Sequence, residues 1–130
     1  MTEPADQPEM PPEVVQVAHA CLDFARHGDA ARLAAYIENG LPVDLADLNG
    51  NTLLMLAAYH GHDEVVALLV DRGADVNRLN TAGQSPLAGA VFKGDDEVVR
   101  LLLAAGADPD LGTPTGRATA QMFGRADLIG

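Results

Sequence analysis

Residues 47–77 read DLNGNTLLMLAAYHGHDEVVALLVDRGADVN, and residues 80–110 repeat the same pattern as NTAGQSPLAGAVFKGDDEVVRLLLAAGADPD. The two stretches begin 33 residues apart, and glycines along the chain keep the same interval. They form three series: Gly28, Gly61 and Gly94; Gly40, Gly73 and Gly106; and Gly50, Gly83 and Gly116. Because glycine is the usual residue where the backbone needs a positive φ, we expect three tight turns in each repeat. A fixed period of this size predicts a stack of units that bury their apolar faces against one another.

Apolar residues recur at three- and four-residue steps between these glycines, which predicts pairs of helices. The expected helices cover residues 13–27 and 30–38, then 52–60 and 63–72, then 85–93 and 95–105. Asp63 and Asp95 lie where an acidic side chain caps or neutralises a helix N-terminus. Leu68 and Leu101 are expected to belong to the core between repeats.

The period divides the chain into repeats at about 13–46, 47–79, 80–112 and 113–130, within one domain at 12–130. Residues 1–11 are acidic and proline-rich, and we expect them to form a disordered tail. They lack the pattern of a secretory signal, and no apolar run is long enough to cross a bilayer.

The composition describes an acidic domain with an aliphatic core. Hydrophobic residues make up 48% of the chain but aromatic residues only 4%, and the net charge is −11. Such a surface offers no cluster of cations to displace phosphate counterions, so neither nucleic acid nor an anionic membrane is an expected partner. Cys21, the single cysteine, is predicted to be a small buried hydrophobe, which fits a reducing compartment and an expected cytoplasmic location.

The quoted stretches resemble the ankyrin repeat almost position by position, through the helix that follows Gly50, Glu64-Val-Val, Leu68-Leu69 and Gly73-Ala-Asp-Val-Asn77. The resemblance implies an all-α solenoid of about four helix-turn-helix repeats, two full and two capping, joined by β-hairpin-like loops. Where the family has Thr-Pro-Leu-His, residues 52–55 are Thr-Leu-Leu-Met and residues 85–88 are Ser-Pro-Leu-Ala, so the histidine that bonds between loops is missing. Gly124 comes three residues earlier than the period predicts, which indicates shorter helices in the last repeat.

No catalytic motif is present in the sequence, and we expect neither an enzyme nor a cofactor site. His60-Gly-His62-Asp63 offers three candidate metal ligands, but Gly61 breaks the helix there and the positions match ordinary inter-helix residues of the repeat. Asp44, Asn77 and Asp110 recur at the repeat period, and we expect each side chain to bond the backbone of its own turn.

Residues that differ between repeats at one structural position are better candidates for recognition. In an ankyrin-like stack the concave face is lined by hairpin tips and by the ends of the first helices. The pairs before the first turn glycine of each unit should therefore form a stripe: Arg26 and His27, Tyr59 and His60, and Phe92 and Lys93. Aromatic and arginine side chains are typical of interfaces, although Tyr59 and Phe92 would also suit packing against neighbouring repeats.

The hairpin tips add further candidates for partner binding. These are Leu48, Asn49 and Asn51 in one hairpin and Leu79, Thr81 and Gln84 in the next. Leu48 and Leu79 are apolar where water favours a polar side chain, and apolar residues exposed together mark contact sites.

The expected function is protein–protein interaction, as an adaptor or regulator that binds a partner protein through the concave face and the tips. We expect the protein to be a monomer. The alternative is an acidic inhibitor, similar to an immunity protein, that blocks a basic effector or nuclease. Binding of that kind should weaken steeply with salt, whereas an adaptor should depend on Tyr59 and Phe92.

Overall fold

The computed structural model describes residues 12–130, and in that range it contains seven α-helices and one short 3-10 helix. They are α1 (Pro12–His27), α2 (Ala30–Glu38), α3 (Leu53–Tyr59), α4 (Asp63–Asp71), α5 (Pro86–Lys93), α6 (Asp96–Ala104), α7 (Gly116–Met122) and the 3-10 helix η1 (Ala126–Leu128). The six helices predicted from the sequence are confirmed, each within one residue at either end. The predicted tail at 1–11 lies outside the described residues. None of the helices in the described range is long and apolar enough to cross a membrane.

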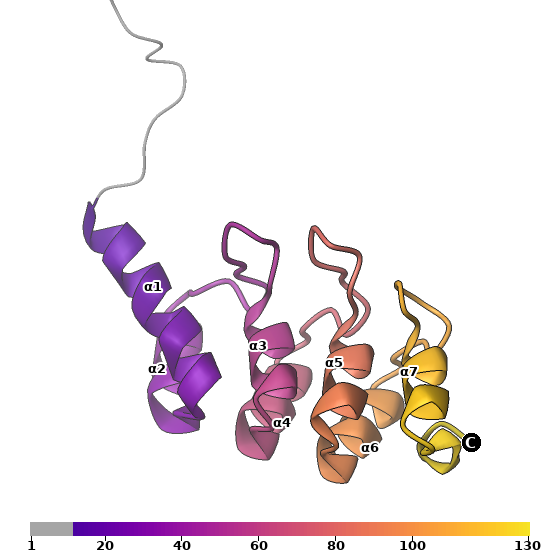
Figure 1. Ribbon diagram of the computed structural model, residues 1–130. Coiled ribbons are helices and arrows are strands. Elements are labelled where there is room, and N and C mark those ends of the chain that lie inside the picture. The colour runs from indigo at the N-terminus through magenta and orange to yellow at the C-terminus, as the bar shows by residue number, and fades with distance from the viewer. Residues whose placement is uncertain (1–11) are drawn as a thin grey trace, which may run out of the picture.

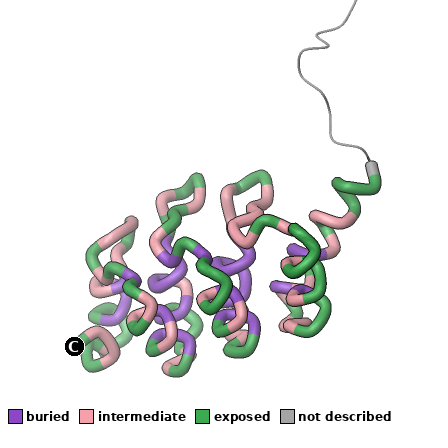
Figure 2. Tube along the Cα trace, turned by 180° about the vertical axis from the view of Figure 1, so that it is seen from behind, coloured by how far each residue is buried: buried purple, intermediate pink, exposed green. Residues whose placement is uncertain are grey.

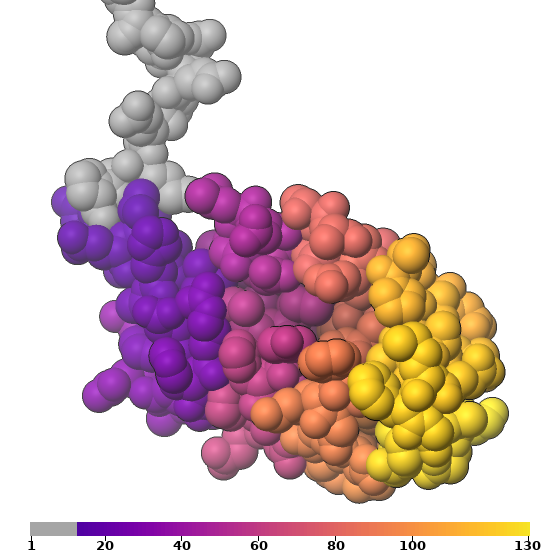
Figure 3. Space-filling model, in the orientation of Figure 1, coloured from indigo at the N-terminus to yellow at the C-terminus, as the bar shows by residue number. Residues whose placement is uncertain are grey.

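The helices form pairs that stack side by side in chain order (Figure 1). α1, α3, α5 and α7 contact one another in that order along one side of the stack, which we call the first-helix face. The loops before α3, α5 and α7 project together beyond one end of the helices (Figure 1). In the space-filling view, the repeats follow one another as bands from the N-terminus to the C-terminus (Figure 3). The fold is therefore the predicted all-α repeat solenoid.

A hydroxyl side chain begins each first helix after α1. The oxygens of Thr52, Ser85 and Thr115 accept a hydrogen bond from the backbone N–H three residues later, at 3.1, 3.1 and 2.9 Å. These bonds satisfy amide groups that have no partner within the helix. The caps therefore fix where α3, α5 and α7 start, and with that start the residues that each helix turns to the surface.

The buried segments of the chain lie toward the middle of the stack (Figure 2), and most of the buried side chains are aliphatic. The fully buried leucines and valines are Leu33, Leu53, Leu54, Leu69, Leu87, Leu102, Val65, Val66, Val98 and Val99. Leu68 and Leu101 pack against this core but are only partly buried, whereas the adjacent Leu69 and Leu102 are fully buried. Helix periodicity explains the difference, because Leu69 lies three and four residues after the buried Val66 and Val65.

Cys21 lies in α1 and is fully buried. Burial raises the pKa of its thiol, because a thiolate is poorly solvated there. The predicted role of Cys21 as a small buried hydrophobe is confirmed.

Asp47 and Asn80 close the hairpins before α3 and α5. Asp47 Oδ1 accepts the backbone N–H groups of Asn49 and Asn51, both at 2.9 Å. Asn80 Oδ1 accepts the equivalent pair in the next hairpin at 3.0 and 2.9 Å. A short polar side chain at the start of each turn thus adds to the few backbone hydrogen bonds that join the two arms of the hairpin.

Neighbouring hairpins are also bonded to each other, although Met55 and Ala88 replace the family's loop-bonding histidine. The backbone N–H and the hydroxyl of Thr81 both donate to the carbonyl of Asn49, at 3.0 and 2.9 Å. The backbone N–H of Thr113 donates to the carbonyl of Gly83 at 2.9 Å. The loops are therefore tied by backbone contacts that do not need a histidine.

Asp44 and Asn77 bond the following repeat, so the prediction that they bond their own turns is wrong. Asp44 Oδ1 accepts the N–H of Asp75 at 3.0 Å, and Asn77 Oδ1 accepts the N–H of Asp108 at 2.8 Å. The local turn bond comes from a residue two positions earlier, since Asp75 Oδ1 accepts the N–H of Asn77 at 3.0 Å. Asp110 forms an ion pair with an arginine of α7 at 2.8 Å.

The last repeat is shortened in its hairpin and in its second helix, but not in its first helix. Gly124 lies nine residues after the cap Thr115, as Gly94 lies nine residues after the cap Ser85. α7 has 7 residues, as α3 has. Only the second helix is reduced, to the 3 residues of η1. The three missing residues therefore come from the hairpin, and the prediction of shorter helices holds for η1 alone.

This shift in register also changes the role of Gly116. It lies in α7 and does not have a positive φ, so the expected turn at Gly116 is wrong. Gly112 has a φ of 90° and makes the turn there. The other eight members of the three glycine series all have positive φ, which confirms the expected turns at those positions.

Candidate functional site

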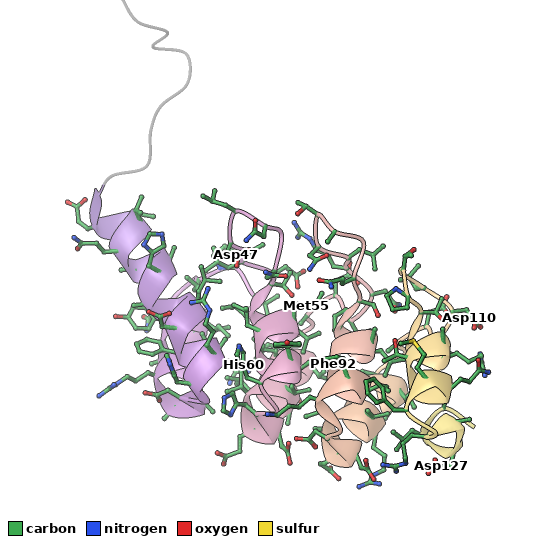
Figure 4. All side chains as sticks on the ribbon, in the orientation of Figure 1. Asp47, Met55, His60, Phe92, Asp110 and Asp127 are labelled. Atoms are coloured by element: carbon green, nitrogen blue, oxygen red, sulfur yellow. The ribbon has the colours of Figure 1, made fainter. Side chains whose placement is uncertain are left out.

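A groove of about 500 Å³ lies on the first-helix face between α3, α5 and α7. Its lining includes Met55, Leu56 and Tyr59 from α3, Ala88, Gly89 and Phe92 from α5, and Thr119, Met122 and Phe123 from α7 and the residue that follows it. Asn51 and Gln84 border it on the hairpin side. This volume is within the range of about 300–1,000 Å³ that is typical of binding pockets. Figure 4 labels Met55 and Phe92 on this face.

Three aromatic rings run along the groove from one repeat to the next. The Tyr59 and Phe92 rings are stacked, with centroids 5.9 Å apart and planes 12° apart. The Phe92 and Phe123 rings meet edge to face, with centroids 5.7 Å apart. Each ring packs against its neighbour and yet stays about half exposed: Tyr59 47%, Phe92 57% and Phe123 50%. Packing between repeats and exposure to a partner are therefore compatible at these positions.

The structure brings together part of the stripe and tips predicted from the sequence. Asn51, Tyr59, Gln84 and Phe92 line the groove. Arg26, Leu48 and Asn49 line a second hollow, of about 570 Å³, between α1 and the first hairpin. His27, His60, Leu79, Thr81 and Lys93 line neither hollow. Seven of the twelve predicted residues therefore line one of two separate hollows, and the other five line neither.

Local contacts explain some of these placements. His27 Nδ1 donates to the carbonyl of Asp23 within α1, at 2.9 Å. The hydroxyl of Thr81 donates its hydrogen bond to the carbonyl of Asn49 in the preceding hairpin. Leu48 is fully exposed but Leu79 is only 36% exposed, so the two leucines do not form one equally open apolar patch.

Sequence reasoning identified four of the residues that line the groove and missed the other nine. Phe123 comes immediately before Gly124, just as the predicted residues His60 and Lys93 come immediately before the turn glycines of their repeats. Extending the same rule to the shortened last repeat finds it. Met55 and Gly89 lie four and three residues before the aromatic residues of their helices, on the same helix face, so helix periodicity is the signal that locates them.

The end of α3 beside the groove lies in a positive environment. The His60 ring lies edge-on to the Tyr59 ring, with centroids 5.4 Å apart. Burial lowers the pKa of His60, and the nearby charges of His62, Lys93 and Arg26 lower it further. A proton on His60 is disfavoured because it would add to positive charge already there.

This shift predicts a pH dependence of stability. The folded-state pKa of His60 lies below its unfolded value of 6.5, so the unfolded chain binds the proton more tightly. The stability that the fold gains from a neutral His60 is fully present above pH 6.5 and is lost as the pH falls through the folded-state pKa. We expect the Tm of wild type to fall more than that of His60→Gln between about pH 7.5 and about pH 5. Thermal melts at both values test this, with His19→Gln as a control, and equal falls for wild type and His60→Gln would contradict it.

The candidate metal ligands at 60–63 have structural contacts instead. His62 Nε2 donates to the carbonyl of Arg26 at 2.6 Å, which joins the second helix pair to α1. Asp63 lies in the first turn of α4. Across residues 12–130, no group of three or more His, Cys, Asp or Glu side chains is arranged to hold a metal ion.

Comparison with known proteins gives the same repeat. The family model for ankyrin repeats in three copies matches residues 19–113. A curated protein of Pseudomonas aeruginosa that is named as an ankyrin repeat protein is 44% identical over 54 residues, which are 42% of this chain and 32% of that protein. The match thus spans about a third of the relative's length. Since the family model covers most of the chain and the structure has the repeat's helix pairs, this chain belongs to the ankyrin repeat family.

Proposed function

We propose that this protein recognises a partner protein through the groove between α3, α5 and α7, as an adaptor or regulator with no chemistry of its own. Ankyrin repeats are generally protein–protein interaction modules, and their fold is generally not enzymatic. The observation that carries the proposal is the row of half-exposed rings formed by Tyr59, Phe92 and Phe123. Large aromatic side chains at the centre of an interface commonly carry most of its binding energy.

The groove also has the general anatomy of a recognition surface. Its centre is apolar, and the amides of Asn51 and Gln84 form a polar border on the hairpin side. Both amides are held in place, because Asn80 Nδ2 donates to Asn51 Oδ1 and to Gln84 Oε1, each at 2.8 Å. A border that is ordered before the partner arrives loses little conformational entropy on binding.

The acidic-inhibitor alternative makes a different demand on the surface. It needs carboxylates at the contact, and the groove lining contains neither Asp nor Glu. The acidic side chains of residues 12–130 therefore lie outside the groove lining. The two functions are separated by the effect of groove mutations and by the effect of salt on binding.

A binding experiment with a double variant tests the proposal. The Tyr59→Ala/Phe92→Ala variant removes two rings of the row, and we expect it to lose at least about tenfold in affinity for the physiological partner. The measurement is affinity capture from a lysate, followed by titration of the captured protein against wild type and variants of equal helicity. Tyr36→Ala is the matched control, because Tyr36 is an exposed aromatic residue of α2 outside the groove.

The control decides what the loss means. A partner that the double variant loses and Tyr36→Ala keeps supports recognition through the groove. A partner that the double variant keeps, but that moderate salt releases, contradicts the proposal and favours the acidic inhibitor.

A further inference from the structure

Gly89 is a glycine that the fold itself does not require. It lies inside α5 and has no positive φ, and a Cβ added there would be 3.8 Å from the nearest atoms of Tyr59, an ordinary contact. Glycine in a helix interior is less favourable than alanine, because the unfolded chain gains conformational freedom. The fold therefore tolerates a side chain here, and its absence has a cost that packing does not explain.

The two neighbouring repeats do have a side chain at this position. Counted from the caps Thr52, Ser85 and Thr115, the residues equivalent to Gly89 are Leu56 and Thr119. Both line the groove, as Gly89 does. The middle repeat thus has no side chain at this position of the groove floor, with Tyr59 in contact distance on one side and Phe92 one helical turn along α5.

Lys93 lies one helical turn after Gly89 in α5, and no carboxylate of residues 12–130 lies within 4.0 Å of its ammonium group. Six of the eight Lys and Arg side chains lie within 4.0 Å of a carboxylate; among residues 12–130, Lys93 and Arg78 are the exceptions. Lys93 follows Phe92 in α5, and its side chain lies over the turn at Gly61, where the Asp95 carboxylate also lies without forming an ion pair of 4.0 Å or less with Lys93. No Asp or Glu lines the groove, so an incoming carboxylate meets no like charge in its lining.

We propose that the space above Gly89 is a specificity pocket for one bulky apolar side chain of the partner, and that an Asp or Glu next to that side chain pairs with Lys93. The preferred partner segment is therefore apolar and acidic, although the protein itself is strongly acidic. This inference rests on the proposed function, since it describes what the groove binds.

Variants at Gly89 separate binding from stability. Gly89→Ala removes the unfavourable helix residue, so its Tm should rise by about 2–5 °C. The same methyl group narrows the pocket, and binding should weaken by about threefold. Gly89→Leu copies the residue of the preceding repeat and fills the pocket, so binding should weaken by at least about tenfold. A purely structural glycine predicts the opposite correlation, because losses of binding would then follow losses of stability.

Paired charge variants test the second part of the proposal. Lys93→Gln should weaken binding by about threefold to tenfold. Arg78→Gln makes the same change in net charge at the other cation without a carboxylate within 4.0 Å, in the loop after α4 rather than in the helix of Gly89, and should leave binding unchanged. Changing the peptide's acidic residue to its amide should give the same loss as Lys93→Gln, with little further loss when the two are combined.

The probe is a display library of random 12-residue peptides selected on the 130-residue chain, and the enriched peptides are then titrated by fluorescence anisotropy. We expect enriched peptides to place an aromatic or large aliphatic residue beside Asp or Glu. Enrichment of basic peptides, or of none, overturns the inference, as does undiminished binding to Gly89→Leu. If Tyr59→Ala/Phe92→Ala loses these peptides while Gly89→Leu keeps them, the pocket is wrong but the proposed function stands. If neither variant loses binding, both fail.

Discussion

Replacing Leu69 with alanine is expected to destabilise the protein by about 2–5 kcal/mol and to lower the Tm by roughly 10 °C or more. Leu69 is fully buried in α4, which packs against α2, α3 and α6. The truncation removes apolar contacts from the core and leaves a cavity that the stacked layers close only in part. Such a loss is a large share of the ~5–15 kcal/mol that stabilises a typical domain. Urea unfolding followed by circular dichroism measures it.

Leu68→Ala is the matched control for this prediction. It makes the same chemical change one residue earlier in the same helix, where the side chain is only partly buried. We expect it to cost clearly less than Leu69→Ala, since fewer contacts are lost and water can fill the space. An equal or larger loss for Leu68→Ala would show that the inward face of α4 is assigned wrongly.

Replacing Gly50 with alanine is expected to cost about 2–4 kcal/mol, from backbone strain and overpacking together. Gly50 has a φ of 76°, a region that L-residues adopt only with strain. An added Cβ would also lie 3.0 Å from the backbone nitrogen of Thr81 and 3.2 Å from the Cα of Asn80. Backbone atoms cannot rotate aside, so the two hairpins must move apart, which weakens the bond from the N–H of Thr81 to Asn49.

Gly83→Ala separates the two contributions. Gly83 occupies the same turn of the next hairpin with a φ of 77°, but an added Cβ there meets no atom within 4 Å. We expect this variant to lose only the strain contribution, about 1–2 kcal/mol. The difference between the variants, measured in parallel unfolding curves, is the contribution of the contact between hairpins. Equal losses would show that the hairpins are not coupled through this contact.

The sequence by itself determined the helices and their order. The glycine period and the three- and four-residue apolar spacing are local signals, and each of the six predicted helices lies within one residue of its expected bounds. The same register selected Tyr59 and Phe92, which line the groove. These predictions succeed because a helix and its turns are specified by residues a few positions apart.

The tertiary structure decided what lies between the repeats. It places Asp44 and Asn77 on the backbone of the next repeat, moves the deletion of the last repeat into its hairpin, and adds Phe123 to the aromatic row. It also shows that Gly89 lies in the groove lining without being needed for packing. Such features depend on contacts between residues about 30 positions apart in the chain. The pattern of residues within one repeat does not specify those contacts. The groove forms because stacking places α3, α5 and α7 side by side, and because their equivalent positions carry side chains of different size.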